Sequence, residues 1–382
     1  MKKLKVIALA LAVILLFPLA SMAQSVPTAG SMSELPCKSA ILMDTETGEV
    51  LYEQNADEAL PPASVTKVMT LLLVMEAIDA GRIALSDTVS VSANAASMGG
   101  SQVFLEEGET MSVEEMLKCV IIASANDCAV ALAEFVSGSE ESFVAAMNAR
   151  AVELGMKNTH FENTNGLDDA AQNHVTSARD IAIMSRALIA HPKILEYSGI
   201  WMDTIRGGEF GLTNTNRLVR YYPGCTGLKT GSTARAGFCV SATAKREGLS
   251  LVCVIMGAES RDSRNASAAK LLDYGFANYE TYRAPGGECE IPVVGSDTQA
   301  LELTWEAFAV TVPKGSASRV SVSRDLPEYL QAPLQAGESV GEIVYSLDNT
   351  EIGRVQMLSK SAVETIDFGG LFRQLLSKFL LL

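Results

Sequence analysis

The chain has 382 residues and a formal net charge of −15, with 48% hydrophobic and 20% charged residues. This hydrophobic content excludes a disordered chain, and the acidic balance argues against nucleic acid as a partner, because phosphate binding depends on clustered Lys and Arg. A chain of this length exceeds the size at which one hydrophobic core usually stops growing, so we expect two domains.

Residues 1–23 have the pattern of a secretory signal peptide. Three lysines precede an apolar stretch at 6–19, and Ala23 ends a run of small residues of the kind that a signal peptidase cleaves. The alternative is an uncleaved anchor helix, for which the apolar stretch is short. We therefore predict cleavage after Ala23 and export to the outer face of the cytoplasmic membrane, where the protein is peripheral.

Residues 24–282 carry a mixture of helical and strand patterns. A Thr47-Gly48 turn separates two short strand patterns, and a polar turn at 245–248 separates two more that are apolar and rich in β-branched residues. Apolar residues at helical spacing, often ended by Gly or Pro, lie between and after them. The strands are expected at 40–43, 49–52, 238–244 and 249–256, and the helices at 65–80, 112–122, 127–136, 140–154, 178–190 and 266–279.

The pattern changes near residue 283, where Pro and two Gly follow Arg283-Ala284. Beyond this point short alternating runs are separated by Pro, Gly and Asp-Asn, which is typical of a small all-β domain. We place this second domain at 283–365, with strands expected at 308–312, 320–322, 341–346 and 352–357.

The last segment, 366–382, predicts an amphipathic helix that lies on a membrane surface. It is too short and too polar on one side to span a bilayer. The alternative is a helix that docks onto the protein's own core. On a helix, one face would carry Leu371, Phe372, Leu375, Leu376, Phe379 and Leu380, and the opposite face Arg373, Gln374 and Lys378.

The seven cysteines give no metal pattern. Their number is odd, their spacings match no zinc site, and several lie inside apolar runs, where Cys behaves as a small core residue. We expect no metal and no other cofactor.

Ser64-Val65-Thr66-Lys67 places a hydroxyl and an amine three residues apart at the start of a predicted helix. Residues i and i+3 share a helix face, so the amine can lie beside the hydroxyl. A serine needs an adjacent base to act as a nucleophile, and a lysine can be that base only as the free amine. Burial and a second nearby cation are the two influences that lower a lysine pKa.

Two further motifs could complete such a site. Lys229-Thr230-Gly231 precedes a predicted strand and offers the second cation, a hydroxyl and a backbone that no side chain covers. Ser124-Ala125-Asn126 joins two predicted helices and adds a hydroxyl for proton relay and an amide that can bond a peptide in both directions. Each motif alone is weak, since 267–270 is another S-x-x-K, but the order and spacing of all three are specific.

With these motifs the chain resembles the low-molecular-weight penicillin-binding proteins, the serine D-Ala-D-Ala carboxypeptidases. The resemblance includes residues 40–44, 166–167, 177–180 and 227–238, the β domain and the tail. It implies an α/β (α+β) catalytic domain of the β-lactamase/transpeptidase type, with an antiparallel sheet flanked by helices. It also implies a hydrolase that removes D-alanine from peptidoglycan stem pentapeptides and that β-lactams inhibit covalently.

The resemblance also implies roles for residues. Ser64 would be the acylated nucleophile, Lys67 its base and Ser124 the proton donor to the leaving D-alanine. The other implied roles concern substrate binding. Asn126 would hold the peptide, and Gly231 would leave room for the ligand. The N–H groups of Ser64 and Ser232 would bind the oxyanion. The terminal carboxylate would be bound by Lys229, Thr230 and Arg264 (or Arg261).

Three other interpretations were weighed. A Ser-His-Asp site would have to use one of three histidines, and none lies in a nucleophile-elbow sequence. A serine β-lactamase needs a carboxylate to activate the deacylating water, and Glu162 is the candidate, although Asn165 follows it by three residues where the class A pattern has four. A non-catalytic peptidoglycan-binding scaffold would not need Ser64 and Lys67.

Overall fold

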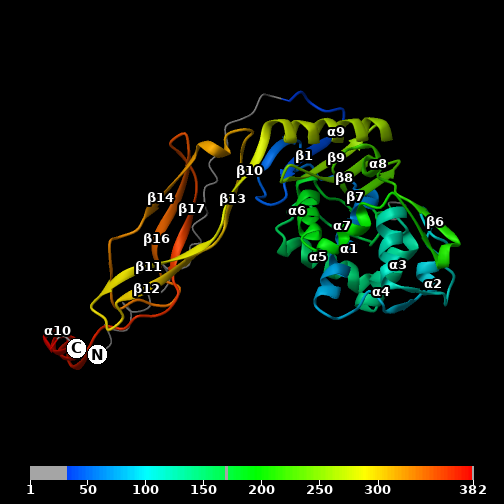
Figure 1. Cartoon of the computed structure of the whole chain (residues 1–382). Coiled ribbons are helices and arrows are strands. Elements are labelled where there is room, and N and C mark those ends of the chain that lie inside the picture. Colours follow the sequence, from blue (N-terminus) through cyan, green and yellow to red (C-terminus); the bar gives the residue numbers. More distant parts are fainter. Residues whose placement is uncertain (1–31, 168–170, 381–382) are drawn as a thin grey trace, which may run out of the picture.

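The computed structural model describes residues 32–167 and 171–380. The predicted signal peptide therefore lies outside the described residues. Two parts are visible in Figure 1: a larger N-terminal domain that contains β1–β9 and α1–α9, and an elongated β-domain that contains β10–β17. Antiparallel strands with helices on both sides, followed by an all-β part, confirm the predicted fold class.

The N-terminal domain is built on a five-stranded antiparallel sheet in the order β2-β1-β9-β8-β7. The interior strands are almost wholly apolar because both faces of the sheet are covered, and β7 at the edge has a partner on one side only. The strands are β1 (Ser39–Asp44), β2 (Val50–Gln54), β7 (Cys225–Thr233), β8 (Gly237–Arg246) and β9 (Leu249–Ala258).

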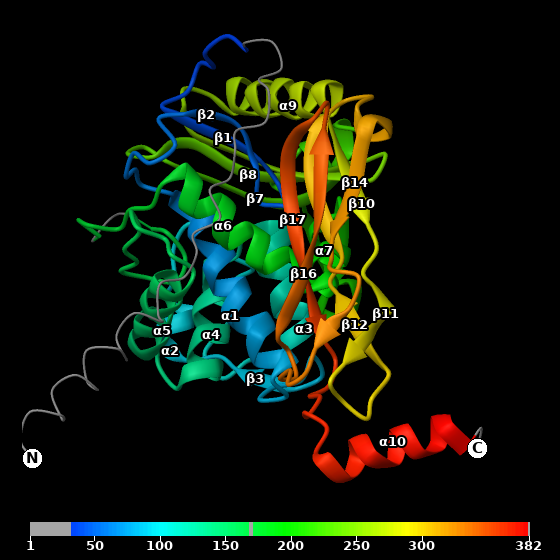
Figure 2. The same cartoon turned by 90° about the vertical axis from the view of Figure 1, so that its left-hand side faces the viewer.

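Helices cover both faces of this sheet. One face packs against α9 through Leu271 and Leu272, and the other packs against α6, which follows a Ser177 N-cap (Figure 2). On the side of α6 that faces away from the sheet, further helices surround α1, in which nine residues are buried. The helices are α1 (Lys67–Asp79), α2 (Ala93–Ala96), α3 (Val113–Lys118), α4 (Asn126–Ser137), α5 (Glu140–Glu153), α6 (Ala178–Ile189), α7 (Pro192–Ser198), α8 (Leu218–Tyr221) and α9 (Arg261–Asn278).

Two short strand pairs lie among these helices. They are β3 (Thr88–Ser90) with β4 (Thr110–Ser112), and β5 (Met202–Ile205) with β6 (Phe210–Thr213). The sequence patterns did not predict either pair.

The β-domain begins as a two-stranded ribbon that leaves the N-terminal domain directly after α9. In it β10 (Tyr279–Ala284) pairs antiparallel with β13 (Phe308–Pro313). A six-stranded sheet follows in the order β14-β16-β17-β12-β11-β15, and its apolar side chains form a separate core around Tyr345 and Met357. Its strands are β11 (Gly287–Val294), β12 (Ala300–Trp305), β14 (Val320–Asp325), β15 (Leu330–Gln331), β16 (Ser339–Leu347) and β17 (Thr350–Ser359).

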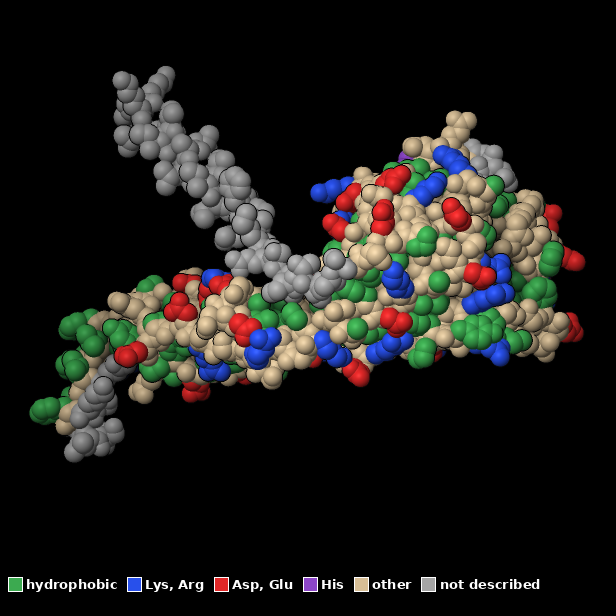
Figure 3. Space-filling view, turned by 90° about the horizontal axis from the view of Figure 1, so that it is seen from above, with side chains coloured by type: hydrophobic (Ala, Val, Ile, Leu, Met, Phe, Trp, Pro, Cys, Tyr) green, Lys and Arg blue, Asp and Glu red, His purple; other side chains and the backbone are tan. Residues whose placement is uncertain are grey.

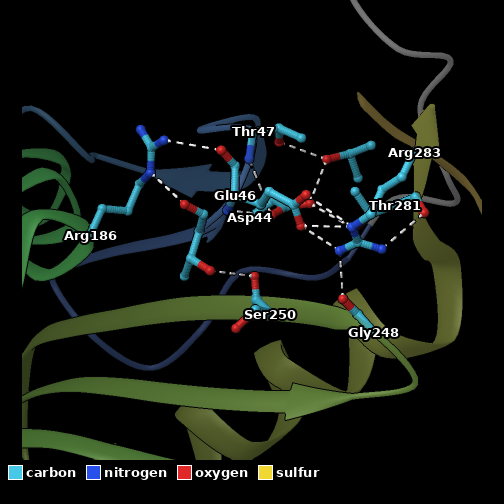
Figure 4. A network of polar contacts seen from close by, with 10 residues as sticks. Asp44, Glu46, Thr47, Arg186, Gly248, Ser250, Thr281 and Arg283 are labelled. Atoms are coloured by element: carbon cyan, nitrogen blue, oxygen red, sulfur yellow. Dashed lines mark hydrogen bonds and ion pairs between the residues drawn. The ribbon is translucent and has the colours of Figure 1, made fainter. Parts of the chain in front are cut away.

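A buried carboxylate joins the two domains (Figure 4). Asp44, at the end of β1, is fully buried, and one of its oxygens accepts hydrogen bonds from the hydroxyls of Thr281 and Thr311 in the ribbon, at 3.2 and 2.8 Å. Beside it Arg283 of β10 forms an ion pair with Glu46 and donates to the carbonyl of Gly248. The ribbon is therefore fixed to the sheet by groups that would be left unpaired if the domains separated.

The chain ends in α10 (Phe368–Leu380), which projects from the far end of the β-domain (Figures 1 and 2). Hydrophobic side chains gather at this end of the molecule (Figure 3), and the apolar residues of α10 are largely exposed, with Phe379 at 87%. No helix within 32–167 or 171–380 is both long enough and apolar enough to cross a bilayer.

Candidate active site

The nucleophile motif lies in a strained turn. Ser64 is in a 3₁₀ turn (Ala63–Thr66) that leads directly into α1, and Ala63 before it has φ +48°, a left-handed conformation that is unfavourable for Ala. A chain of hydrogen bonds holds the turn. The backbone N–H of Glu162 donates to Nδ1 of His174, so the proton of this imidazole is on Nε2. Nε2 donates to Thr66 Oγ1, and the Thr66 hydroxyl donates to the Ala63 carbonyl. His174 is therefore structural.

Lys67, the first residue of α1, lies beneath Ser64 and is fully buried. Its Nζ is 2.9 Å from Ser64 Oγ, 2.5 Å from Asn126 Oδ1 and 2.9 Å from the backbone oxygen of Asn165. Burial, and then the charge of Lys229, hold the pKa of Lys67 well below its usual value, although the carboxylate of Asp127 opposes the shift. The environment therefore favours the free amine.

The Ser124-Ala125-Asn126 motif lies where a π-helical turn (Cys119–Ala123) ends and α4 begins. Ser124 has φ +64° and is 4% exposed, and its hydroxyl makes no hydrogen bond with another described residue. The amide of Asn126 accepts from Lys67 and donates to the Gly99 carbonyl at 2.7 Å, which leaves its second N–H for a ligand.

Lys229 and Thr230 lie inside the edge strand β7, so the prediction that this motif only precedes a strand was incomplete. Lys229 is buried opposite Ser241 of β8, and burial, followed by the charge of Arg264, lowers its pKa to about 7. The hydroxyl of Thr230 donates to that of Thr215 at 2.8 Å.

Gly231 allows β7 to run directly against the turn of the nucleophile. A Cβ atom at this position would lie 2.7 Å from the backbone nitrogen of Ser64 and 2.8 Å from the oxygen of Pro62. Any larger residue would therefore push the strand away from Ser64.

A cleft of about 530 Å³ connects these groups. Lys67, Asn126 and Lys229 lie behind its wall, whereas the other six site residues predicted from the sequence line it. Its lining consists of Ser64, Ser101, Ser124, Trp201, Thr213, Asn214, Thr215, Arg217, Tyr221, Thr230, Gly231, Ser232, Arg261 and Arg264.

Both candidate arginines lie in the first turn of α9 and line the cleft. Arg264 is 3% exposed and is fixed by hydrogen bonds to Asn265 Oδ1 and, at 3.4 Å, to the carbonyl of Cys239. Burial, followed by the charge of Arg261, lowers its pKa to about 10. Arg261 is exposed. Arg264 is therefore buried and held by hydrogen bonds, whereas the side chain of Arg261 is open to solvent.

Glu162, the candidate base of a β-lactamase, does not line the cleft. Its side chain is exposed and accepts a hydrogen bond from the backbone N–H of Asn173 at 3.1 Å. The residue from this segment that reaches the site is Asn165, through its backbone oxygen. Of the described residues that line the cleft, none is Asp or Glu.

Other groups at the site belong to no sequence motif and were not predicted. Asp127 is buried and accepts from the backbone N–H groups of Val103 and Leu105, which fixes the loop that brings Ser101 to the cleft. Thr215 and Trp201 come from the unpredicted segment around β5 and β6. The position of Asp127 beside Asn126 was the only available signal for these groups.

Comparison with known proteins indicates the same family as the motifs do, over nearly the whole chain. A model of the D-alanyl-D-alanine carboxypeptidase family matches residues 23–260, and a model of the penicillin-binding protein 5 C-terminal domain matches 290–365. D-alanyl-D-alanine carboxypeptidase DacF of Bacillus subtilis is 42% identical over 339 residues, covering 87% of each chain. DacC of Escherichia coli is 36% identical over 352 residues, covering 87% of this chain and 84% of its own.

Solved structures agree. Penicillin-binding protein 5 of Haemophilus influenzae superposes with a TM-score of 0.79 at 32% identity, covering 88% of this chain and all of that one. Penicillin-binding protein D2 of Listeria monocytogenes, solved in the ampicillin-bound form, has a TM-score of 0.59 at 33% identity and covers 63% of this chain and 98% of its own. The resemblance drawn from the motifs is confirmed: this chain belongs to the D-alanyl-D-alanine carboxypeptidase family of serine peptidases.

Proposed function

We propose that the protein removes the terminal D-alanine from peptidoglycan stem pentapeptides through an acyl-enzyme formed on Ser64. The observation that carries this proposal is the environment of Lys67. Two of its three contacts, Asn126 Oδ1 and the Asn165 carbonyl, can only accept hydrogen bonds, and the third is the Ser64 hydroxyl. A neutral amine has two N–H groups and one lone pair, so the two acceptors occupy the N–H groups and the lone pair faces Ser64.

Acylation follows from this arrangement. Ser64 Oγ attacks the carbonyl carbon of the penultimate D-alanine while its proton passes to Lys67, and the N–H groups of Ser64 and Ser232 stabilise the oxyanion. Ser124, whose hydroxyl has no partner among the described residues, relays the proton from Lys67 to the nitrogen of the leaving D-alanine. The C–N bond breaks, and water then hydrolyses the Ser64 ester and restores both groups.

The substrate would be held along β7. Asn126 can donate its remaining N–H to the carbonyl of the peptide, since its other contacts fix the amide. The hydroxyl of Thr230 and the guanidinium of Arg264 line the cleft where the terminal carboxylate would lie, and the buried amine of Lys229 lies behind this part of the wall. A bound carboxylate favours the protonated form of Lys229, whose pKa lies near 7 in the free protein.

A β-lactam can acylate Ser64 by the same route, because its strained amide occupies the position of the scissile peptide. Rapid hydrolysis of that ester needs a base for the attacking water. The described lining residues of the cleft include no carboxylate, and Glu162 is exposed outside it. These observations support a carboxypeptidase that β-lactams inhibit and weigh against a β-lactamase.

The test compares two reactions of the purified protein. We expect release of one D-alanine per pentapeptide with steady turnover, whereas benzylpenicillin should give a long-lived covalent adduct with one equivalent bound. D-alanine is measured with a coupled oxidase assay and the adduct by intact-protein mass spectrometry. Fast turnover of penicillin without release of D-alanine would show a β-lactamase instead, and neither reaction would show a non-catalytic scaffold.

We further propose that the mature protein acts at the outer face of the cytoplasmic membrane, with residues 24–282 as the catalytic domain, 283–365 as a β-domain and 366–382 as the anchor. Support comes from α10, which projects from the end of the β-domain (Figure 2) and whose exposed residues include Leu371 (44%), Phe372 (57%) and Leu375 (59%). An exposed apolar face on a terminal helix favours insertion into the lipid interface.

Removal of residues 366–382 should release the protein from membranes. Most of the full-length protein should pellet with vesicles, and most of the truncated protein should remain in the supernatant. The loss of ten large apolar side chains removes several kcal/mol of binding free energy. A matched control removes only 381–382 and should still pellet. Equal labelling of both forms by fluorescent penicillin checks that the catalytic domain is intact, and unchanged pelleting of the long truncation would refute the anchor.

A further inference from the structure

Three arginines converge at one end of the catalytic cleft. Arg217, Arg261 and Arg264 all line it, and no acidic residue does so among the described part of the chain. Arg217 and Arg261 are exposed, and neither side chain forms an ion pair or a hydrogen bond with another described residue. This concentration of positive charge is notable in a chain whose net charge is −15.

The arrangement is unfavourable for the protein alone. Arg261 and Arg264 lie in the first turn of the 18-residue helix α9, where the helix dipole disfavours cations. Burial, and then the charges of Arg261 and Arg217, lower the pKa of Arg264 to about 10, so the three guanidinium groups repel one another. Asp262 in the same turn opposes this shift, and an anion bound among the arginines would relieve the repulsion that remains.

The loop that carries Arg217 is held rigid. The buried amide of Asn214 donates to the carbonyls of Ser198 and Ile200, and its oxygen accepts from the N–H of Asn216. The amide of Asn216 donates in turn to the Gly227 carbonyl. Arg217 therefore projects from a fixed backbone, which lowers the entropic cost of binding an anion.

An aromatic wall lies beside Arg217. Trp201 and Tyr221 both line the cleft with ring centroids 6.2 Å apart, and the guanidinium of Arg220 lies 5.4 Å from the Trp201 ring. These contacts fix the two rings in the cleft wall that they share with Arg217.

One terminal carboxylate does not account for all of these cations. Thr230 and the fixed Arg264 already line the proposed carboxylate position and Lys229 lies behind it, which leaves Arg217 and Arg261 on the open side of the same end. We propose that Arg217 and Arg261 form a second anion subsite, which binds a carboxylate on the side chain of the leaving residue. The inference rests on the proposed function and extends it to stem peptides that end in an acidic D-amino acid.

The test uses two blocked tripeptides that end in D-alanyl-D-alanine and in D-alanyl-D-glutamate. The measured quantity is the ratio of kcat/KM for the acidic peptide to kcat/KM for the D-alanine peptide. In Arg217→Gln we expect this ratio to fall about tenfold, the effect of losing one charge-assisted contact at an exposed position. Arg217→Lys keeps the charge and should keep the ratio within about threefold. Arg82→Gln removes an exposed arginine outside the cleft and should change neither rate.

The possible outcomes are distinct. A tenfold fall in the ratio with recovery in Arg217→Lys supports the subsite, and fluorescent penicillin labelling shows that each variant is folded. An unchanged ratio in Arg217→Gln, or a wild-type protein that releases D-alanine but no D-glutamate, overturns the subsite and leaves the proposed function intact. A wild-type protein that releases neither amino acid overturns the proposed function and, with it, this inference.

Discussion

Ser64→Ala should reduce D-alanine release by about 10⁴-fold or more and abolish covalent labelling by penicillin. The acyl-enzyme needs an oxygen at this position, and among the described residues Ser64 is the one hydroxyl with which Lys67 Nζ forms a hydrogen bond. Because Ser64 is at the surface of the cleft, the change removes one hydroxyl and leaves the buried turn of Ala63 and Thr66 in place. Stability should therefore change little.

The chain supplies its own control for this experiment. Ser267 and Lys270 form a second S-x-x-K in α9, where Ser267 is buried at 3% and lies outside the cleft lining. Ser267→Ala should keep full labelling and D-alanine release. Gel fluorescence with a labelled penicillin and thermal unfolding of both variants separate loss of the nucleophile from loss of the fold. Persistent labelling of Ser64→Ala would refute the nucleophile assignment.

Lys67→Met should reduce the rate of acylation by about 10³-fold, because the side chain keeps its length but loses the base. The substitution also removes the donor to Asn126 Oδ1 and to the Asn165 carbonyl, so some loss of stability is expected. Lys270→Met in the second S-x-x-K is the matched control. Lys270 is exposed and its amine donates a hydrogen bond to the Ser33 hydroxyl, so this substitution should leave acylation unchanged. Stopped-flow acylation by a chromogenic cephalosporin measures both.

The same variant has a pH signature. Acylation requires the free amine, so the wild-type rate should rise with pH through the pKa of Lys67, which burial and Lys229 hold well below its usual value. This acidic limb should be absent in Lys67→Met. A residual rate in Lys67→Met that keeps the wild-type pH profile would assign the base to another group.

The motifs predicted residues that the structure brings together around one cleft, because the spacing within each motif is local. Ser64 and Lys67 share a helix face by spacing alone, and the order of the three motifs identified the family. The strands at 40–43 and 249–256 were predicted because both are long apolar runs. The structure extends them only slightly, to Ser39–Asp44 and Leu249–Ala258.

The remaining features depend on contacts that no local pattern encodes. The Asn165 contact uses a backbone oxygen, which any residue would supply, so its identity carries no signal. Helix α9 begins at Arg261, five residues before the predicted start at 266. The prediction was late because Ser260, which is the N-cap, and the two arginines after it form a polar sequence that is also typical of a loop. Strand β11 was missed because Pro292 interrupts an otherwise alternating pattern.

Asp44 limits where the enzyme can reach. Both domains donate hydrogen bonds to its buried carboxylate, so a swing of the β-domain would remove the hydroxyl donors of Thr281 and Thr311, while the backbone N–H of Glu46 would stay bound, and the loss of these two bonds makes the swing unfavourable. The separation between α10 and Ser64 then depends on the length of the β10–β13 ribbon and of the six-stranded sheet that follows it. An enzyme anchored through α10 would work at one depth of the cell wall, and each two residues in the ribbon would correspond to about 7 Å of that depth.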